Sequence, residues 1–250
     1  MAKILEICVD SLASARAAIA GGADRLELCS ALLAGGLTPY EGLLRQIREE
    51  SMIPIRCLMR PRPGDFLYTP EELELMRQQI LSLKAAGADG FVIGCLTPEG
   101  NLDKAAMKPL IDACGTSGIT LHRCIDVSRD PVETYRLAGQ LGIDTVLTSG
   151  AAASCSAGQH VIRQLIALRD SEGGPEVLIG AGVNAGVIRH FRQTDPSARA
   201  FHASCKTELE SAMRFRREGV PMGLPGLDEW HIQQTSEEAV RAARIALDEA

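Results

Sequence analysis

Three ionisable side chains fall within five positions of an otherwise strand-like segment, Thr120–Asp126, near the middle of the chain. They are His122, Arg123 and Asp126. A buried parallel strand is normally almost entirely apolar, and ionisable groups are seldom placed where strands converge unless they bind or react. An imidazole near a carboxylate can act as a general acid and base. The segment therefore predicts a binding or catalytic site at the end of a strand.

The elements that must position these groups alternate between strand-like and helix-like segments along the whole chain. The strand-like segments are 3–9, 25–29, 53–60, 91–95, 119–126, 145–149, 176–180 and 199–203. The helix-like segments are 11–21, 40–50, 71–86, 104–114, 131–141, 159–170, 185–193 and 236–248. Such alternation predicts a parallel sheet with helical crossovers. About eight βα units in 250 residues predict an α/β fold, a single TIM-type (β/α)8 barrel domain over residues 1–250.

Two recurring local patterns support these boundaries. Thr38–Glu41 and Thr69–Glu72 each place a threonine before a proline and a glutamate, which is typical of a helix start. A glycine followed by an aspartate and a strand recurs at Gly22–Leu28, Gly87–Ile93 and Gly142–Leu147, before the second, fourth and sixth predicted strands. Repetition of one connection favours a barrel over two dissimilar domains, although common turn chemistry alone can also produce it.

The phase of each predicted strand indicates which side chains point into the barrel, because alternate residues face inward and the others pack under helices. In the first strand the apolar phase is Leu5, Ile7 and Val9, which leaves Glu6 and Cys8 inside. The same reasoning gives the inward set Glu6, Cys8, Glu27, Cys29, Arg56, Arg60, His122, Cys124, Asp126, Thr148, His202 and Ser204. Arg123 falls in the opposite phase, so either a bulge re-aims it or it pairs within the helical layer.

Acidic and imidazole groups of this set belong at the carboxyl ends of the strands, where barrel active sites gather. The candidate catalytic acids and bases are Glu6, Glu27, His122, Asp126 and His202. The structural alternative is a layer of ion pairs that fills the barrel, with the two glutamates opposite Arg56 and Arg60. Burying several charges carries a desolvation penalty of several kcal/mol per ion, so a functional role is the favoured interpretation.

Two loops are candidate anion sites. Arg60 and Arg62 lie in a proline-braced turn after the third predicted strand, and an arginine fork fits a carboxylate or a phosphate. The alternative is a loop that is tied down by a neighbouring acid such as Asp65. Gly180 and Gly182 follow the seventh predicted strand, where barrel enzymes often bind phosphate. A simple tight turn explains these glycines equally well.

Composition narrows the class of protein. The net charge of -6, the pI near 5.5 and an aromatic content of 4% argue against a surface that binds nucleic acid. No stretch approaches the roughly 20 apolar residues that span a bilayer, and no signal peptide is recognised, so we expect no membrane contact and a cytoplasmic protein. The eight cysteines are scattered without a Cys-x-x-Cys pair, which indicates free thiols in a reducing compartment.

The segment of about residues 206–234 after the last strand fits no regular pattern well. Loops of this length in compact domains usually have a function or are disordered. Because it contains Trp230, the only tryptophan, we expect an ordered cover for the barrel or part of a dimer contact.

Several segments resemble motifs of the CutC copper homeostasis family, and the similarity spans nearly the whole chain. They are 6–11 (EICVDS), 21–29 (GGADRLELC), 35–39 (GGLTP), 60–62 (RPR), 64–66 (GDF), 122–123 (HR), 148–150 (TSG) and 201–204 (FHAS). The resemblance implies a cytoplasmic TIM-type barrel, a homodimer, a role in copper tolerance, and copper(I) held by the strand-end cysteines Cys8 and Cys29. Ala181 interrupts a glycine triplet of the family pattern, which weakens the phosphate interpretation of its loop.

The chemistry supports copper only in part. Soft thiolates suit copper(I), but hard carboxylates and guanidinium groups crowd the same barrel mouth. The favoured hypothesis, from the resemblance, is a copper homeostasis protein that binds copper(I) through Cys8 and Cys29. The alternative is a barrel enzyme, a lyase, isomerase or hydrolase, that acts on a small phosphorylated or carboxylated metabolite. A scaffold with a degenerate barrel mouth is the third hypothesis, and the sequence does not settle whether the protein is an enzyme.

Overall fold

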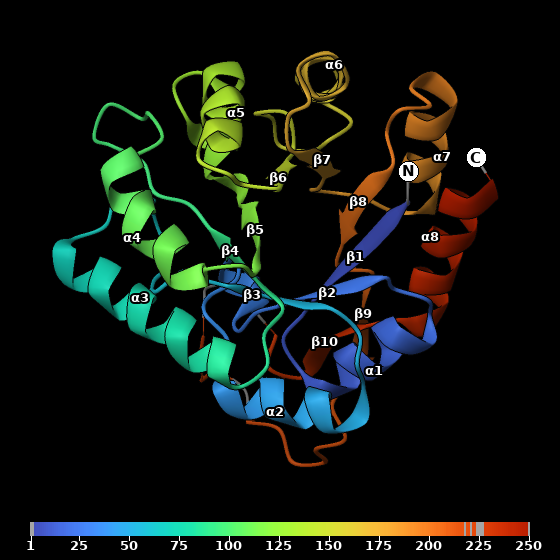
Figure 1. Ribbon diagram of the computed structural model, residues 1–250. Coiled ribbons are helices and arrows are strands. Elements are labelled where there is room, and N and C mark those ends of the chain that lie inside the picture. The colour runs from blue at the N-terminus through green and yellow to red at the C-terminus, as the bar shows by residue number, and fades with distance from the viewer. Residues whose placement is uncertain (1–2, 218, 221, 224–227, 250) are drawn as a thin grey trace.

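A computed structural model describes residues 3–217, 219–220, 222–223 and 228–249 and contains a closed parallel barrel ringed by helices (Figure 1). The barrel strands, which follow the chain order, are β1 (Ile4–Val9), β2 (Arg25–Leu28), β3 (Ile55–Leu58), β4 (Gly90–Ile93), β5 (Gly118–Leu121), β6 (Thr145–Thr148), β7 (Glu176–Ile179) and β8 (Ala200–Ala203). The helices are α1 (Leu12–Ala20), α2 (Glu41–Glu50), α3 (Pro70–Ala85), α4 (Lys104–Cys114), α5 (Pro131–Gln140), α6 (Gln159–Glu172), α7 (Ala185–Thr194) and α8 (Glu237–Glu249), with short 3-10 turns η1 (Leu32–Ala34) and η2 (Arg123–Val127). The predicted TIM-type barrel is confirmed.

Strand phase follows the expected rule. On β1 the side chains of Leu5, Ile7 and Val9 are fully buried in the main apolar cluster between barrel and helices. The intervening Glu6 pairs in register with Arg25 of β2 and with His202 of β8. A parallel sheet that is covered by helices is buried on both faces. The strand register brings polar side chains of neighbouring strands together inside the barrel.

The recurring glycine–aspartate motif has a structural role. Each of its aspartates accepts a hydrogen bond from the first or second backbone N–H of the strand that precedes it along the barrel. These bonds run from Leu5 N to Asp24 (2.7 Å), from Ile55 N to Asp89 (2.7 Å) and from Ile119 N to Asp144 (2.5 Å). Because an unpaired buried N–H is costly, the repeat fixes the starts of alternate strands, at the barrel end opposite the site.

One of the two predicted helix starts is confirmed. Thr69 caps α3, and its side chain and that of Glu72 form a reciprocal capping box. The other helix, α2, begins at Glu41, one residue after its predicted start, but the predicted Thr38 cap is wrong, because Tyr40 occupies the cap position. Thr38 instead accepts a hydrogen bond through Oγ1 from the backbone N–H of Arg60, 3.0 Å away. This threonine therefore links two loops at the barrel mouth.

The strand predicted at 119–126 is shorter than expected. β5 ends at Leu121, and Arg123–Val127 forms the 3-10 turn η2. Nδ1 of His122 accepts a hydrogen bond from the backbone N–H of Cys124, 3.2 Å away, so the imidazole caps the turn. The turn takes Arg123 out of the strand alternation and directs its side chain to the barrel mouth and not into the helical layer.

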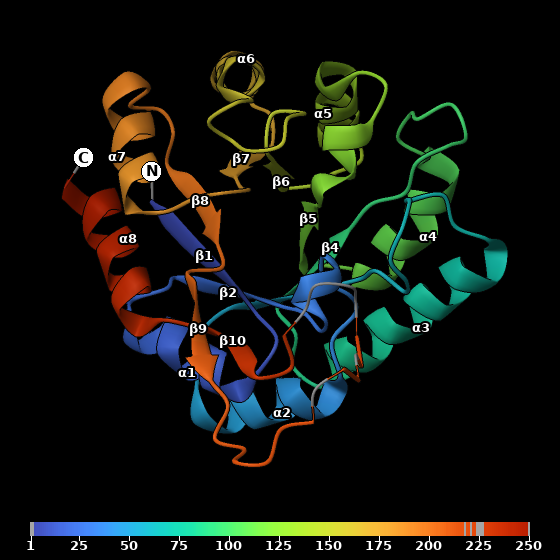
Figure 2. The ribbon, with the colours of Figure 1, turned by 180° about the vertical axis from the view of Figure 1, so that it is seen from behind.

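The segment of about 206–234 holds an antiparallel hairpin, β9 (Lys206–Glu210) with β10 (His231–Thr235). Both views place it beside α1 (Figures 1 and 2), and the backbone N–H of Thr235 donates to Ser14 Oγ at 3.1 Å. Residues 218, 221 and 224–227 of this segment lie outside the described residues. Large apolar side chains such as Phe215 are exposed on it, and its part in a dimer contact stays a prediction. In the described ranges, every helix is too short or too polar to cross a membrane.

Candidate functional site

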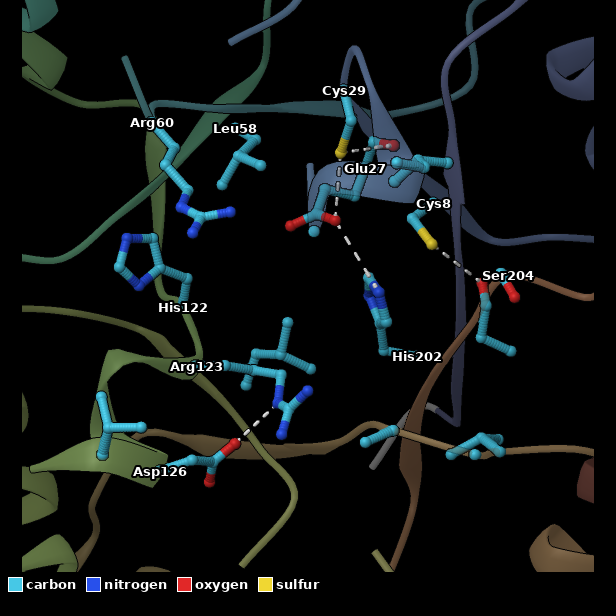
Figure 3. Close-up of a pocket in the computed structure, with 18 of the residues that line it drawn as sticks. Cys8, Glu27, Cys29, Leu58, Arg60, His122, Arg123, Asp126, His202 and Ser204 are labelled. Atoms are coloured by element: carbon cyan, nitrogen blue, oxygen red, sulfur yellow. Dashed lines mark hydrogen bonds and ion pairs between the residues drawn. The ribbon is translucent and has the colours of Figure 1, made fainter. Parts of the chain in front are cut away.

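A cavity of about 480 Å³ opens at the carboxyl ends of the barrel strands (Figure 3). Predicted site residues that line it are Cys8, Glu27, Cys29, Arg60, His122, Asp126, Gly182 and His202. Glu6, Arg62 and Gly180 are not among its lining residues. Most of the expected groups therefore line a single cavity, although they come from six different βα units.

His202 lies between two carboxylates. Its Nδ1 is 2.8 Å from Oε1 of Glu6, and its Nε2 is 3.7 Å from Oε2 of Glu27. Burial alone lowers the pKa of this imidazole, but the neighbouring Cys8 and the two carboxylates outweigh burial and raise the pKa well above its ordinary value. His202 is therefore held as an imidazolium in the cavity wall.

Glu6 lies fully buried beneath His202. Its Oε2 is 2.5 Å from Nε of Arg25, a residue that is absent from the set predicted by strand phase. Burial raises the pKa of Glu6, yet Arg25 and His202 together bring it down to about 2. Since Arg25 has the same phase as Glu27 on β2, the strand pattern contained the signal for this partner. Glu6 is therefore ionised at neutral pH and supports His202.

The expected pairing of the glutamates with Arg56 and Arg60 is wrong. Glu6 pairs with Arg25, and Arg56, although it is in register with Glu27, has other partners. Arg56 donates to Thr120 Oγ1 (2.5 Å) and to Asp144 (2.6 Å), near the starts of the strands. Only part of the structural alternative therefore holds: Glu6 is neutralised by a buried arginine, whereas Glu27 faces His202 and a thiol at the cavity.

Glu27 connects the imidazolium with the strand-end cysteines. The Cys29 thiol donates to Oε2 of Glu27 at 3.4 Å, and the Cys8 thiol donates to the carbonyl oxygen of Ala203 at 3.6 Å. Burial raises the pKa of Glu27. Burial, together with Glu27 and Cys8, raises the pKa of Cys29 well above its ordinary value. At neutral pH Cys29 is therefore a thiol and not a thiolate.

One group of three metal-ligand atoms occurs in the part of the chain that the structure describes. It comprises Cys8, Glu27 and His202, whose donor atoms all lie within 4.8 Å of one another. Cys29 is not a member of this group. A thiolate and an imidazole are suitable ligands for a soft ion, whereas a carboxylate prefers harder ones.

His122 lies on the facing wall and is only 4% exposed. Burial, followed by the charge of Arg60, lowers the pKa of this imidazole to about 3. Its ring packs against Phe66 at a tilt of 41°, with the ring centroids 4.6 Å apart, and a Cβ on Gly94 would lie 2.5 Å from His122 Cε1. His122 is therefore neutral and closely confined, in contrast to His202.

Arg60 braces the loops around this wall. Its Nη1 donates to the carbonyl oxygens of Ala34 (3.3 Å) and Gly36 (3.1 Å), and its Nη2 donates to that of Gly64 (3.0 Å). The guanidinium carbon lies 5.3 Å from the centre of the Phe66 ring. Most donors of Arg60 are thus engaged within the protein, while its positive charge remains at the cavity.

Asp126 is saturated with hydrogen bonds. It accepts from Thr148 Oγ1 (2.5 Å), from Ser149 N and Oγ (both 2.9 Å) and from Ala151 N (3.1 Å), and its Oδ2 is 2.7 Å from Nε of Arg123. The Asp126 side chain is only 4% exposed, whereas that of Arg123 is 44% exposed. Asp126 therefore orients Arg123, a cation at the cavity that strand phase alone missed.

Arg62 and Gly180, two of the predicted anion-binding residues, make contacts within the protein and do not line the cavity. Nε of Arg62 is 2.5 Å from Glu72, and its Nη1 is 3.0 Å from Asp65, so acids tie down this loop as the alternative interpretation proposed. The N–H of Gly180 donates to the carbonyl oxygen of Thr148 at 2.9 Å, which continues the sheet and removes that donor from an anion site. Of the glycine pair, only Gly182, in the left-handed region at φ +80°, borders the cavity.

The sequence is similar to those of known proteins over most of its length. The sequence profile of the CutC family matches residues 3–207. A family protein CutC from Chromobacterium violaceum is 41% identical over 251 residues, covering 100% of both chains. The chain belongs to the CutC family. A mouse relative named copper homeostasis protein cutC homolog is 39% identical over 220 residues, 88% of this chain and 80% of the mouse protein.

One solved structure of a CutC protein agrees with this family membership. The structure of a CutC protein from Streptococcus agalactiae has a TM-score of 0.75 at 25% identity and covers 81% of this chain and 98% of that one. The 3-hexulose-6-phosphate synthase of Salmonella typhimurium has a TM-score of 0.58 at 12% identity, over 98% of this chain and 99% of that one. The latter similarity shows the barrel fold alone.

Proposed function

We propose that this CutC family protein is an enzyme that moves a proton on a small anionic metabolite at the barrel mouth. The observation that carries the proposal is the contact of Glu27 with the His202 imidazolium in the cavity wall, supported from below by Glu6 and Arg25. Figure 3 shows Glu27, His202 and Cys8 on one side of the cavity and Arg60, His122 and Arg123 on the other. A substrate between them meets an acid–base pair on one side and two cations on the other.

The charges suit this reaction. A carboxylate whose pKa is raised by burial is a stronger base than an exposed one, and Glu27 meets that condition. The imidazolium of His202 can return a proton or stabilise charge that develops on the substrate. Arg123 and Arg60 attract a phosphate or carboxylate into a partly buried site, where charge interactions are strong. The reaction classes that fit are isomerase, lyase and hydrolase.

Activity is tested by incubating the purified protein with a mixture of small phosphorylated and carboxylated metabolites and following every compound by mass spectrometry. We expect the wild type to convert at least one compound and Glu27→Gln to convert it about 10²–10⁴-fold more slowly. The matched control is Glu208→Gln, which changes an exposed carboxylate on β9. Failure of the wild type to convert any compound, or full activity of Glu27→Gln, contradicts the proposal.

A second candidate is copper(I) binding at the same wall, and the group of Cys8, Glu27 and His202 favours it. Copper would then be a cargo ion, in keeping with the names of the mouse and human relatives. Its binding requires a Cys8 thiolate and a neutral His202, so protons compete with the metal. Because the pKa of His202 is raised, copper affinity is expected to increase as the pH rises. Cys29 contributes through its contact with Glu27, or directly if its thiol is deprotonated.

Copper binding is tested by anaerobic titration of copper(I) against a competing chelator. Cys8→Ser is expected to weaken binding because it removes a soft ligand. Cys29→Ser is expected to weaken binding because it removes the thiol that contacts the ligand Glu27. Cys57→Ser, which changes a buried cysteine in the apolar layer outside the barrel, is the control and is expected to bind as the wild type does. Unchanged affinity in Cys8→Ser and Cys29→Ser removes this candidate. We also propose a cytoplasmic location and a homodimer, because the family resemblance implies both.

A further inference from the structure

One wall of the cavity offers a sulfur, a nitrogen and an oxygen donor to the same small volume. The donors belong to Cys8, His202 and Glu27, and the donor atoms all lie within 4.8 Å of one another. All three residues line the cavity, on the side that Figure 3 shows opposite Arg60 and His122. They come from β1, β8 and β2, which are neighbours in the barrel. Paired strands therefore position a complete set of metal ligands beside an open path of entry.

The spacing of these donors is close to that of a tetrahedral zinc site. Zinc binds imidazole nitrogen and carboxylate oxygen at about 2.0–2.2 Å, so two such ligands are about 3.4 Å apart. Nε2 of His202 and Oε2 of Glu27 are 3.7 Å apart. A thiolate at about 2.3 Å from the ion lies about 3.6 Å from the other two donors, and the group as a whole spans no more than 4.8 Å. Small side-chain movements are enough to bring the three donors to one ion.

The far side of the His202 ring is held as it is in zinc proteins. A histidine that binds a metal through one nitrogen usually donates the N–H of the other nitrogen to a carboxylate, which fixes the ring. Nδ1 of His202 is 2.8 Å from Oε1 of Glu6, and Oε2 of Glu6 is 2.5 Å from Nε of Arg25. The outer shell of the site is thus already in place, and it leaves Nε2 facing Glu27.

The mixture of donors selects among metals. Copper(I) prefers soft sulfur ligands, and magnesium and calcium prefer oxygen, whereas zinc accepts thiolate, imidazole and carboxylate together. We infer that the protein binds one zinc ion through Sγ of Cys8, Oε2 of Glu27 and Nε2 of His202, with the fourth position open to the cavity. Cys29, the second cysteine of the copper hypothesis, lies outside this group.

Zinc binding goes beyond the proposed function and regulates it. Glu27 and His202 cannot accept and return a proton while their lone pairs bind an ion. Zinc is therefore expected to stop the conversion of a metabolite by the wild type, and removal of zinc by a chelator is expected to restore it. The open fourth position is where a water molecule or an anion completes the coordination of the ion.

The test uses zinc and cobalt(II), which can replace zinc and gives a sulfur-to-cobalt charge-transfer band when a thiolate binds it. Metal-free protein is titrated with zinc against a competing chelator, and we expect one zinc ion per chain. Glu6→Gln changes an outer-shell partner and is expected to weaken zinc binding about 10–100-fold. Cys8→Ser and His202→Gln each remove a ligand and are expected to weaken it by more than about 100-fold, and Cys8→Ser to lose the cobalt–sulfur band.

Two other cysteines provide the controls. Cys29→Ser removes a thiol that contacts Glu27 but is not a ligand, so it is expected to keep the cobalt–sulfur band and to lose less affinity than Cys8→Ser. Cys57→Ser, in the apolar layer outside the barrel, is expected to match the wild type. The inference is overturned if the wild type binds no zinc, if the band survives in a folded Cys8→Ser, or if a folded Cys29→Ser loses it. None of these readouts requires catalysis, so they test the zinc site separately from the proposed function.

Discussion

Replacing Glu6 with alanine is expected to lower the free energy of unfolding by about 3–5 kcal/mol, because it leaves buried charges without their partner. Glu6 is fully buried and contacts both Arg25 and His202. Glu6→Gln is expected to have a smaller effect, since the amide can keep one hydrogen bond. Urea denaturation followed by circular dichroism measures the change.

The control for this prediction is an exposed pair of the same chemistry. Glu50 lies 2.5 Å from Arg16, but the two side chains are 41% and 61% exposed. Exposed ion pairs contribute little, so Glu50→Ala is expected to leave stability almost unchanged. A Glu6→Ala protein that is as stable as Glu50→Ala means that the buried network does not hold His202 in the manner described.

Acid is expected to destabilise the protein through His122. The pKa of this residue is about 3 in the folded protein against 6.5 for an ordinary histidine, so the unfolded chain binds the proton more tightly. The stability that neutral His122 contributes is therefore present above about pH 6.5 and is lost as the pH falls toward 3. With about 1.4 kcal/mol for each pKa unit, the loss is on the order of 3 kcal/mol at about pH 4.

His122→Gln isolates this contribution from that of the carboxylates. The variant has no titrating group at the position, so its free energy of unfolding should change less than that of the wild type between about pH 7 and about pH 4. The difference between the two changes is expected to be on the order of 3 kcal/mol. Equal changes in both proteins mean that His122 is hydrated and not confined beside Phe66.

Strand phase predicted much of the site because it depends only on the alternation of side chains. Glu6 and Cys8 on β1, Glu27 on β2 and His202 on β8 could be placed inside the barrel from the apolar residues between them. Their convergence then follows from barrel closure. The same rule failed for Arg123, because a hydrogen bond from the Cys124 backbone to the His122 side chain ends the strand early and begins a turn.

Pairings between charges could not be predicted in the same way. Which arginine meets Glu6 depends on the register of neighbouring strands, and the register places Arg25, and not Arg56, beside it. Arg62 binds Glu72 because α3 begins next to the loop, a tertiary contact that local sequence does not contain. The hairpin of β9 and β10 was missed because most of its residues are exposed and lack an apolar phase.

The proposed acid–base chemistry requires an imidazolium at His202, whereas the buried ring of His122 on the facing wall is expected to be neutral. Nitrogen-15 NMR of the imidazole rings measures both, with His202→Gln and His122→Gln to assign the signals among the five histidines. We expect His202 to remain doubly protonated well above pH 6.5 and His122 to stay neutral until the pH approaches about 3. A His202 ring that is neutral at pH 7, or a His122 ring that gains its second proton near pH 6.5, contradicts this assignment.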